Sequence, residues 1–333
     1  MNITEALEEF LCRWHQADVD TMLVQTSGST GVPKAMFVPK VRMRASAEAT
    51  LRFLGLKEGD TALLCLPLKY IAGQMMVVRA EIGRLHLLVV EPSSRPLATL
   101  ADAPHFAAMT PMQVYESLQH VHDAALLREI RHLLIGGGAT SAALEKQLID
   151  FPYAVWSTYG MTETLSHIAL RRLNGVGRSS YYRPLAGVNV SLNAERQTLD
   201  IFAPHVCSEV LHTHDVGEIR ADGSFVILGR VDNVVCSGGI KLQIEQLETR
   251  LVGVFTMPYA LTYVVDARLG QALSLIYTDP ISSKEALARC ATQLARLECP
   301  RYAFQVESLP LTATHKPARV ALHSLAEQLV ARN

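Results

Sequence analysis

The chain contains 333 residues, of which 49% are hydrophobic and 19% are charged, and its formal net charge is −1. These values are ordinary for a globular protein with a large core, and the sequence has no basic block that would indicate nucleic-acid binding. No apolar run approaches the length that a membrane-spanning helix requires. The six cysteines form no CxxC pair, so we expect reduced thiols and a cytoplasmic protein.

Short apolar runs alternate with longer amphipathic runs up to about residue 170, after a first short strand expected at Met22–Val24. Further strands are expected at Ala62–Leu66, His86–Val90, Phe106–Met109, His132–Ile135 and Ala154–Ser157. Helices are expected at Val41–Leu54, Met75–Ile82, Pro111–His122 and Ser141–Phe151. This alternation predicts α/β layering around a largely parallel sheet.

The helical period disappears over residues 176–229, where turn residues and short apolar pieces predict a small β-rich subdomain. Its strands are expected at Val188–Leu192, Thr198–Phe202, Glu218–Arg220 and Phe225–Leu228. A compact α+β pattern follows, with strands at Leu261–Val265 and Leu273–Tyr277 and helices at Gln243–Val252, Ser282–Leu297 and Arg319–Ala331. We therefore expect a large domain over residues 1–229 and a small C-terminal domain over residues 230–333, with the boundary at residues 230–232.

A loop rich in glycine and hydroxyl side chains follows the first short strand. It consists of Thr26, Ser27, Gly28, Ser29, Thr30, Gly31, Val32, Pro33 and Lys34. Backbone N–H groups and hydroxyls in such a loop can face one point and bind an anion, and lysine adds a charge suited to phosphate. An ordinary polar turn is the alternative, and the loop is not a Walker A motif because proline precedes the lysine.

Three later segments strengthen the phosphate interpretation, because they occur in a recognisable order. They are Tyr159–Glu163, Gly229–Asn233 and Leu309–Thr312 running on to Lys316. Together with the loop they resemble the adenylate-forming superfamily of acyl-CoA synthetases, luciferases and peptide-synthetase adenylation domains. Within it, the residues around Leu66–Gly73, Met109–Pro111 and Gly160–Arg171 are most similar to short bacterial o-succinylbenzoate–CoA ligases.

The resemblance implies an ATP-dependent acid–CoA ligase, with ATP, Mg²⁺ and CoA as cofactor and co-substrates, acting in menaquinone biosynthesis. A carboxylate would attack the α-phosphate of ATP, and the thiol of CoA would then attack the acyl-adenylate. It also implies a small C-terminal domain that swings about a hinge at Asp232 between the two steps. The phosphate loop lies later in most relatives, which implies a shortened N-terminus here.

The resemblance also assigns nucleotide-binding roles. The loop from Thr26 to Lys34 would hold the β- and γ-phosphates. Adenine would pack on the glycine-rich turn and on the aromatic ring that follows it, and the ribose hydroxyls would bind an aspartate and an arginine. These residues are Gly137, Gly138, Ala139, Tyr159 and Gly160 for adenine, and Asp215 and Arg230 for ribose.

The remaining roles concern the reacting atoms and the thiol. Thr162 would contact the α-phosphate, and Glu163 would hold Mg²⁺, a cation that prefers oxygen ligands. Lys316 would bridge the carboxylate and the α-phosphate during the first step, although His315 stands where the family usually has glycine. Gly238 and Gly239 would line the tunnel for the pantetheine arm of CoA.

The acid pocket is the part for which the sequence offers only alternatives. A second carboxylate on the substrate would need a donor-rich partner if buried. Candidates are Arg79, Lys69, Ser166 and His167, each of which could equally have a surface or core role. Two alternative functions are a ligase for another aromatic or fatty acid and an inactive relative that binds nucleotide. The sequence also leaves open whether the chain forms a homo-oligomer.

Overall fold

The computed structural model describes residues 2–25, 35–312 and 316–332. Its largest sheet has seven strands within this part of the chain, in the order β4-β3-β5-β6-β7-β8-β9. The strands are β3 (Thr61–Leu64), β4 (His86–Val89), β5 (Phe106–Met109), β6 (His132–Ile135), β7 (Ala154–Gly160), β8 (His167–Arg172) and β9 (Arg183–Pro184). Neighbours from β4 to β7 are parallel, whereas β8 and β9 are antiparallel, so the expectation of a largely parallel sheet is confirmed.

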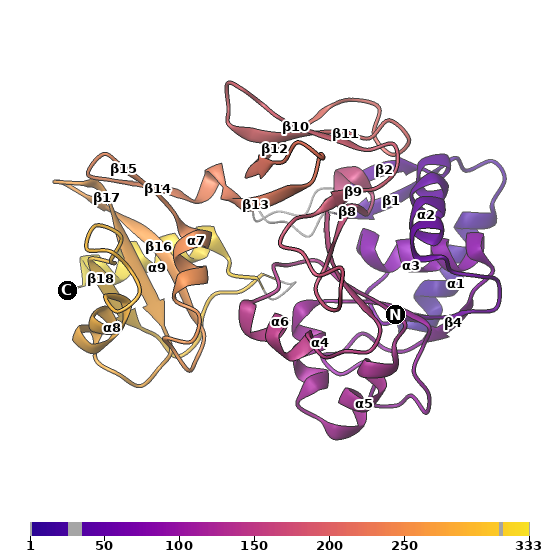
Figure 1. Cartoon of the computed structure of the whole chain (residues 1–333), viewed down its shortest axis with the longest axis horizontal. Coiled ribbons are helices and arrows are strands. Elements are labelled where there is room, and N and C mark those ends of the chain that lie inside the picture. The colour runs from indigo at the N-terminus through magenta and orange to yellow at the C-terminus, as the bar shows by residue number, and fades with distance from the viewer. Residues whose placement is uncertain (1, 26–34, 313–315, 333) are drawn as a thin grey trace.

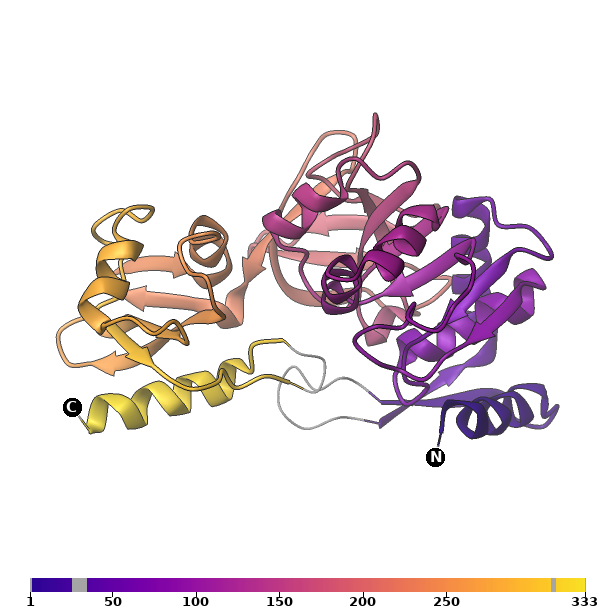
Figure 2. The same cartoon turned by 90° about the horizontal axis from the view of Figure 1, so that it is seen from below.

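Helices cover both faces of this sheet (Figures 1 and 2). They are α1 (Ile3–His15), α2 (Lys40–Leu54), α3 (Ile71–Gly83), α4 (Pro111–Leu118), α5 (Val121–Glu129) and α6 (Ala142–Leu148). Alternate strand residues point to opposite faces, so Leu64 and Leu134 join the core with α2 and α3, while Leu63 and Leu133 join the core with α4 to α6. Burial on both faces explains why these strands are continuous apolar runs.

A second, antiparallel sheet of four strands follows in the order β10-β11-β12-β13. Its strands are β10 (Asn189–Leu192), β11 (Thr198–Phe202), β12 (Leu211–Ile219) and β13 (Phe225–Arg230). A bridge between Tyr182 and Phe225 joins it to the end of the large sheet, and Phe225 is fully buried in the shared core. A hairpin of β1 (Thr21–Gln25) and β2 (Ala35–Pro39) packs beside α2.

The C-terminal elements surround cores of their own (Figure 1). Strands β15, β14, β17 and β16 pair in that order, and β18 adds to β17 in parallel. These elements are β14 (Val234–Ser237), β15 (Ile240–Gln243), α7 (Ile244–Arg250), β16 (Tyr259–Asp266), β17 (Gly270–Tyr277), α8 (Ser283–Cys290), β18 (Tyr302–Gln305) and α9 (Arg319–Ala331). No helix in residues 2–25, 35–312 and 316–332 is long and apolar enough to cross a membrane.

Several expected elements differ from the observed ones. The helix expected at Pro111–His122 is two helices, because His120 is extended between α4 and α5, although neither glycine nor proline marks the break. The strand expected at Glu218–Arg220 is only the end of β12, and the helix expected at Ser282–Leu297 ends at Cys290. Helix α1 was not expected at all.

Helix α1 is built from local signals and one long-range contact. Asn2 and Glu5 form a reciprocal capping box at its start. At its end, the ammonium of Lys40 donates to the carbonyl oxygens of Arg13 and Gln16 at 2.8 and 3.0 Å. A cation at this position satisfies carbonyls that have no partner within the helix. Lys40 therefore ties α1 to the start of α2.

Candidate active site

The parallel strands β5, β6 and β7 deliver three chain segments to one edge of the large sheet. Thr110 follows β5, Gly136 follows β6, and Gly160 ends β7. Ligands of open α/β sheets bind outside the carboxyl ends of such strands. A separate cavity, lined by residues such as Asp102 and Arg131, lies at the opposite edge, where the strands begin. The sheet geometry therefore favours a ligand site at the carboxyl ends of β5, β6 and β7.

The glycine-rich turn after β6 presents backbone rather than side chains. Gly137 has a φ of +79°, which disfavours any residue with a Cβ. A Cβ added to Gly138 would lie 3.6 Å from Cε of Lys316. Gly138 and Lys316 are therefore neighbours although 178 positions separate them, and Ala139 follows as an exposed residue. This arrangement offers a flat ligand a bare surface beside an ammonium group.

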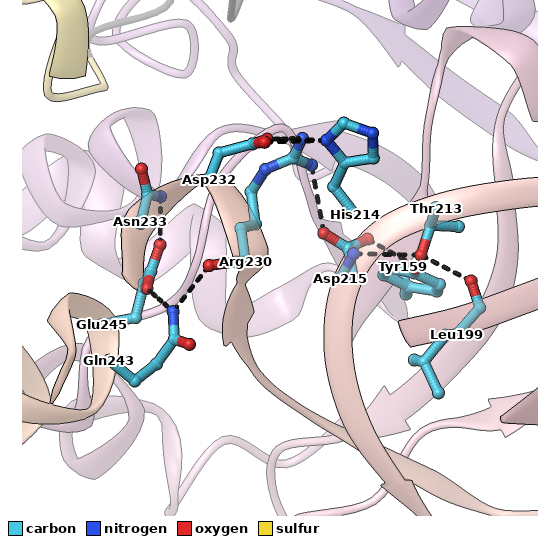
Figure 3. A network of polar contacts seen from close by, with 10 residues as sticks. All are labelled: Tyr159, Leu199, Thr213, His214, Asp215, Arg230, Asp232, Asn233, Gln243 and Glu245. Atoms are coloured by element: carbon cyan, nitrogen blue, oxygen red, sulfur yellow. Dashed lines mark hydrogen bonds and ion pairs between the residues drawn. The ribbon is translucent and has the colours of Figure 1, made fainter. Parts of the chain in front are cut away.

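Tyr159 and Arg230 converge on Asp215 (Figure 3). The hydroxyl of Tyr159 donates to one carboxylate oxygen of Asp215 at 2.6 Å, and Arg230 donates to the other at 3.1 Å. Asp215 and Arg230 are opposite each other on β12 and β13, which explains why they meet. Each carboxylate oxygen keeps a further lone pair, so Asp215 can still accept from two hydroxyls of a ligand.

The environment shifts the proton affinities of this cluster. Burial, followed by the negative charge of Asp215, raises the pKa of Tyr159, so its hydroxyl stays a donor. Burial works to lower the pKa of Arg230, but the hydrogen bonds and charges of Asp232 and Asp215 raise it overall. Burial, followed by the charge of Arg230, lowers the pKa of Lys316. The cluster thus holds two cations against a single well-buried carboxylate, Asp215.

Lys316 is anchored through its backbone. Its N–H donates to the hydroxyl of Thr312 at 3.1 Å, and the N–H of Thr312 donates to the carbonyl of Lys316 at 2.8 Å. An antiparallel bridge between Leu311 and Pro317 encloses the same segment. The side chain is directed by these contacts toward the turn at Gly138.

Thr162 and Glu163 lie in a single 3₁₀ turn, η1 (Thr162–Thr164), directly after β7. Glu163 is exposed, whereas Leu165, which follows the turn, is buried with a φ of +65°. A positive φ at a bulky residue is a strained conformation of the kind that clusters at functional sites. The described residues contain no group of three or more metal-binding side chains, so Glu163 could hold Mg²⁺ only together with ligand oxygens.

Gly160 has a structural reason to be glycine. A Cβ at this position would lie 2.6 Å from Cα of His167, closer than real side chains approach. The sequence resemblance gave Gly160 a close approach to adenine, but the close approach observed is to the backbone of Ser166 and His167. Gly160 thereby packs the end of β7 onto the start of β8.

Three of the four acid-pocket candidates gather next to this turn. Arg79 on α3 is 2% exposed and donates to the hydroxyl of Ser166, which contacts His167. Burial lowers the pKa of Arg79 to about 9. None of the acidic side chains described in the structure pairs with it, and its buried Nε–H has no partner there. Lys69, the fourth candidate, is exposed and lies over the ring of Tyr70 instead.

Asp232 lies in a second 3₁₀ turn, η2 (Val231–Asn233), between β13 and β14. Its carboxylate accepts from Arg230 at 2.9 Å and from Nδ1 of His214 at 2.9 Å. Partial burial works to raise the pKa of Asp232, but the hydrogen bonds from His214 and Arg230 lower it overall. The side chain of the expected hinge residue is therefore held by two hydrogen-bond donors, Arg230 and His214.

Further contacts of this network were not foreseen from the sequence (Figure 3). The amide of Gln243 donates to the carbonyl of Arg230 at 2.9 Å and to Glu245, which also accepts from Asn233. Side chains alternate between the two faces of β12, so His214 lies on the face opposite Asp215. This alternation was the only sequence signal that bears on the contact between His214 and Asp232. Neither Gln243 nor Glu245 carries a motif that would identify it.

The structure does not bring every predicted residue to this edge. Gly238 and Gly239 form the turn of the β14–β15 hairpin, with φ values of +56° and +84°, and both are exposed. Figure 1 shows β14 and β15 leading away from the large sheet, so the turn between them lies apart from that sheet. The predicted phosphate loop, residues 26–34, and His315 lie outside the described residues.

The sequence is similar to known nucleotide-dependent enzymes, as the position of the candidate site at the end of the sheet also suggests. Residues 14–229 match the family described as AMP-binding enzyme. Among curated proteins, a 2-succinylbenzoate–CoA ligase of Bacillus cereus (strain AH820) is 26% identical over 345 aligned positions, covering 92% of this chain and 70% of the relative. The corresponding ligase of Bacillus thuringiensis subsp. konkukian is equally similar, with the same identity and coverage.

Solved structures support the same assignment. An AMP-forming acyl-CoA synthetase/AMP-acid ligase II-like protein from Dyadobacter fermentans is 32% identical, with a TM-score of 0.65, and the match covers 95% of this chain and 92% of that protein. The o-succinylbenzoate coenzyme A synthetase of Bacillus subtilis shares the fold with a TM-score of 0.75 at 21% identity, covering 90% of this chain and 69% of that protein. The chain belongs to the AMP-binding enzyme family.

Proposed function

We propose that this chain is an ATP-dependent acid–CoA ligase that acts on o-succinylbenzoate. It would join the acid to AMP with release of pyrophosphate, and then transfer the acyl group to the thiol of CoA with release of AMP. The curated relatives named 2-succinylbenzoate–CoA ligase, at 26% identity, support this chemistry. The observation that carries the proposal is the cluster of Lys316, Asp215 and Arg230 beside the bare turn at Gly138.

In the first step, negative charge builds on the oxygens around the α-phosphate. The ammonium of Lys316 and the hydroxyl of Thr162 would stabilise that charge, since preorganised donors act most strongly where water is excluded. Asp215 and Arg230 would hold the ribose, and Tyr159 would fix the carboxylate of Asp215. The protein then needs to supply position and charge rather than a covalent intermediate of its own.

Mg²⁺ fits the donor set at η1, because Glu163 offers an exposed carboxylate and the phosphates of the nucleotide would complete an oxygen shell. When bound, the ion would neutralise charge on the phosphate oxygens.

The second step would require Lys316 to leave. The thiol of CoA must approach the same acyl carbon, and Gly238 and Gly239 would line its path after the C-terminal elements turn about Asp232. A residue that absorbs a large backbone rotation commonly lies in a short connection between elements, as Asp232 does between β13 and β14.

The acid is proposed from the chemistry around Arg79. A buried guanidinium with an unpaired N–H favours a substrate that brings a second anionic group. An unbranched fatty acid would leave that charge unpaired. We infer a dicarboxylate, of which o-succinylbenzoate is the one that the curated relatives name.

Mass spectrometry of a reaction with protein, MgATP, CoA and o-succinylbenzoate tests the proposal, with benzoate and octanoate in parallel reactions. We expect an o-succinylbenzoyl-CoA product and no thioester from the other two acids. A thioester from octanoate or benzoate alone would assign a ligase of different specificity. Nucleotide binding without magnesium-dependent pyrophosphate release from any acid would instead indicate an inactive relative.

A further inference from the structure

A chain of hydrogen bonds runs from α2 through β8 to α3 and ends on Arg79. The hydroxyl of Thr50 contacts the carbonyl of Ser46 at 3.2 Å and Nε2 of His167 at 3.2 Å. Nδ1 of His167 contacts the hydroxyl of Ser166 at 3.3 Å, and Ser166 in turn contacts Nη2 of Arg79. Thr50 and His167 are both buried, as is Arg79.

When every contact in this chain is a hydrogen bond and the imidazole ring is neutral, donor counting leaves one set of bond directions. A carbonyl only accepts, so the single hydroxyl proton of Thr50 goes to Ser46. Nε2 of His167 must then donate to Thr50, which leaves Nδ1 as the acceptor in the neutral ring. The hydroxyl of Ser166 therefore donates to Nδ1 and can accept only from Arg79, an obligatory donor. Burial and the charge of Arg79 hold the pKa of His167 well below its usual value, which agrees with a neutral ring.

The consequence concerns the unused donors of Arg79. One Nη2–H is committed to Ser166, and Nη1 faces the sulfur of Met76 at 3.8 Å, a weak acceptor. The buried Nε–H has no partner among the described residues. The hydrogen bond to Ser166 holds the planar guanidinium in one orientation. Its free N–H donors can therefore bind a carboxylate with little further loss of side-chain conformational entropy.

We propose that Thr50 and His167 are positioning residues that fix Ser166 and Arg79, and thereby set the preference of the enzyme for an acid with a second carboxylate. The inference rests on the proposed acid–CoA ligase function. It goes beyond that function because Thr50 and His167 would act through Arg79, not on the substrate.

Thr50→Val tests the proposal, because valine keeps the shape of threonine and removes the acceptor of His167. Loss of one buried hydrogen bond corresponds to about a five- to tenfold effect. We expect KM for o-succinylbenzoate to rise by about that factor with kcat unchanged. KM for the analogue that keeps the carboxylate to be activated and lacks only the second one should stay the same. Thr50→Ser, which keeps the hydroxyl, should restore the wild-type KM.

Thr198→Val is the matched control. Thr198 on β11 is equally buried, but its hydroxyl has no hydrogen-bond partner in the described part of the chain. The same substitution there should leave every KM unchanged. Equal effects of Thr50→Val on KM for the dicarboxylate and for the analogue without the second carboxylate would overturn the proposal, since a general packing defect makes no such distinction.

A second measurement does not depend on turnover. Nitrogen NMR of ¹⁵N-histidine-labelled protein should show His167 as a neutral ring protonated on Nε2, with the signal assigned by its loss in His167→Gln. Thr50→Val should shift that signal. A ring protonated on Nδ1, or on both nitrogens, would refute the bond directions even if the wild-type enzyme used o-succinylbenzoate. Failure of the wild-type enzyme to use o-succinylbenzoate, with the Nε2 signal present, would instead count against the proposed function alone.

Discussion

Replacement of Arg79 by methionine should stabilise the free protein while impairing recognition of the acid. Burial lowers the pKa of Arg79 from the ordinary value of arginine to about 9, and no acidic side chain of the described residues offsets its charge. At about 1.36 kcal/mol for each pH unit, this difference corresponds to about 5 kcal/mol. Methionine fills a similar elongated volume without a charge.

The sign and size of the effect follow from this pKa. Because the folded-state pKa is the lower one, the cost is fully present below pH 9 and disappears as pH rises from about 9 toward the ordinary pKa of arginine. At pH 7 the wild-type protein therefore carries the whole cost. Side-chain relaxation reduces the gain on substitution, so we expect Arg79→Met to raise the free energy of unfolding by about 1–4 kcal/mol.

Urea unfolding at pH 7, followed by circular dichroism, measures this gain. Arg84→Met is the control, because Arg84 lies at the end of the same helix and forms an ion pair with Glu58 in which both side chains are at least 70% exposed. Such surface pairs contribute little, so Arg84→Met should change stability by less than about 1 kcal/mol. A less stable Arg79→Met protein would refute the view that this charge is uncompensated.

Three further substitutions test the site. Lys316→Ala should abolish adenylation, measured by pyrophosphate release, yet leave thioester formation from supplied acyl-adenylate largely intact; equal loss of both would contradict a role confined to step one. Asp232→Pro should spare adenylation and slow thioester formation in single-turnover assays, because proline restricts the backbone at the proposed hinge. Gly160→Ala should lower the thermal unfolding temperature by several degrees, since its Cβ would collide with the backbone at His167; unchanged stability would show that β8 can shift.

The parallel sheet was predictable because its strands carry a strong local signal. Phe106–Met109 and His132–Ile135 are apolar runs bounded by turns, and the observed strands have the same bounds. Helix α1 gave a weaker signal, because it buries only Ile3, Phe10 and Trp14 and presents charged residues elsewhere. Its capping box was nevertheless present in the sequence.

The site was predictable only where neighbours in sequence are also neighbours in space. Thr162 and Glu163 share a turn, so a motif could identify them together. Thr50 and His167 are 117 positions apart, and nothing local to either residue indicates their contact. The pairing of His214 with Asp232 likewise depends on how β12 and η2 meet. Such contacts are set by packing of distant elements, which single-sequence patterns do not encode.

Arg230 connects Asp215, the proposed ribose-binding residue, to the proposed hinge residue Asp232, and the two carboxylates differ in exposure. The Asp215 side chain is 10% exposed, whereas that of Asp232 is 47% exposed. Exposed ion pairs contribute at most about 1 kcal/mol, so the contact of Asp232 with Arg230 can break at low cost. The more buried pair with Asp215, supported by Tyr159, should persist. Rotation at Asp232 would therefore release the C-terminal elements while the proposed ribose site at Asp215 and Arg230 stays intact.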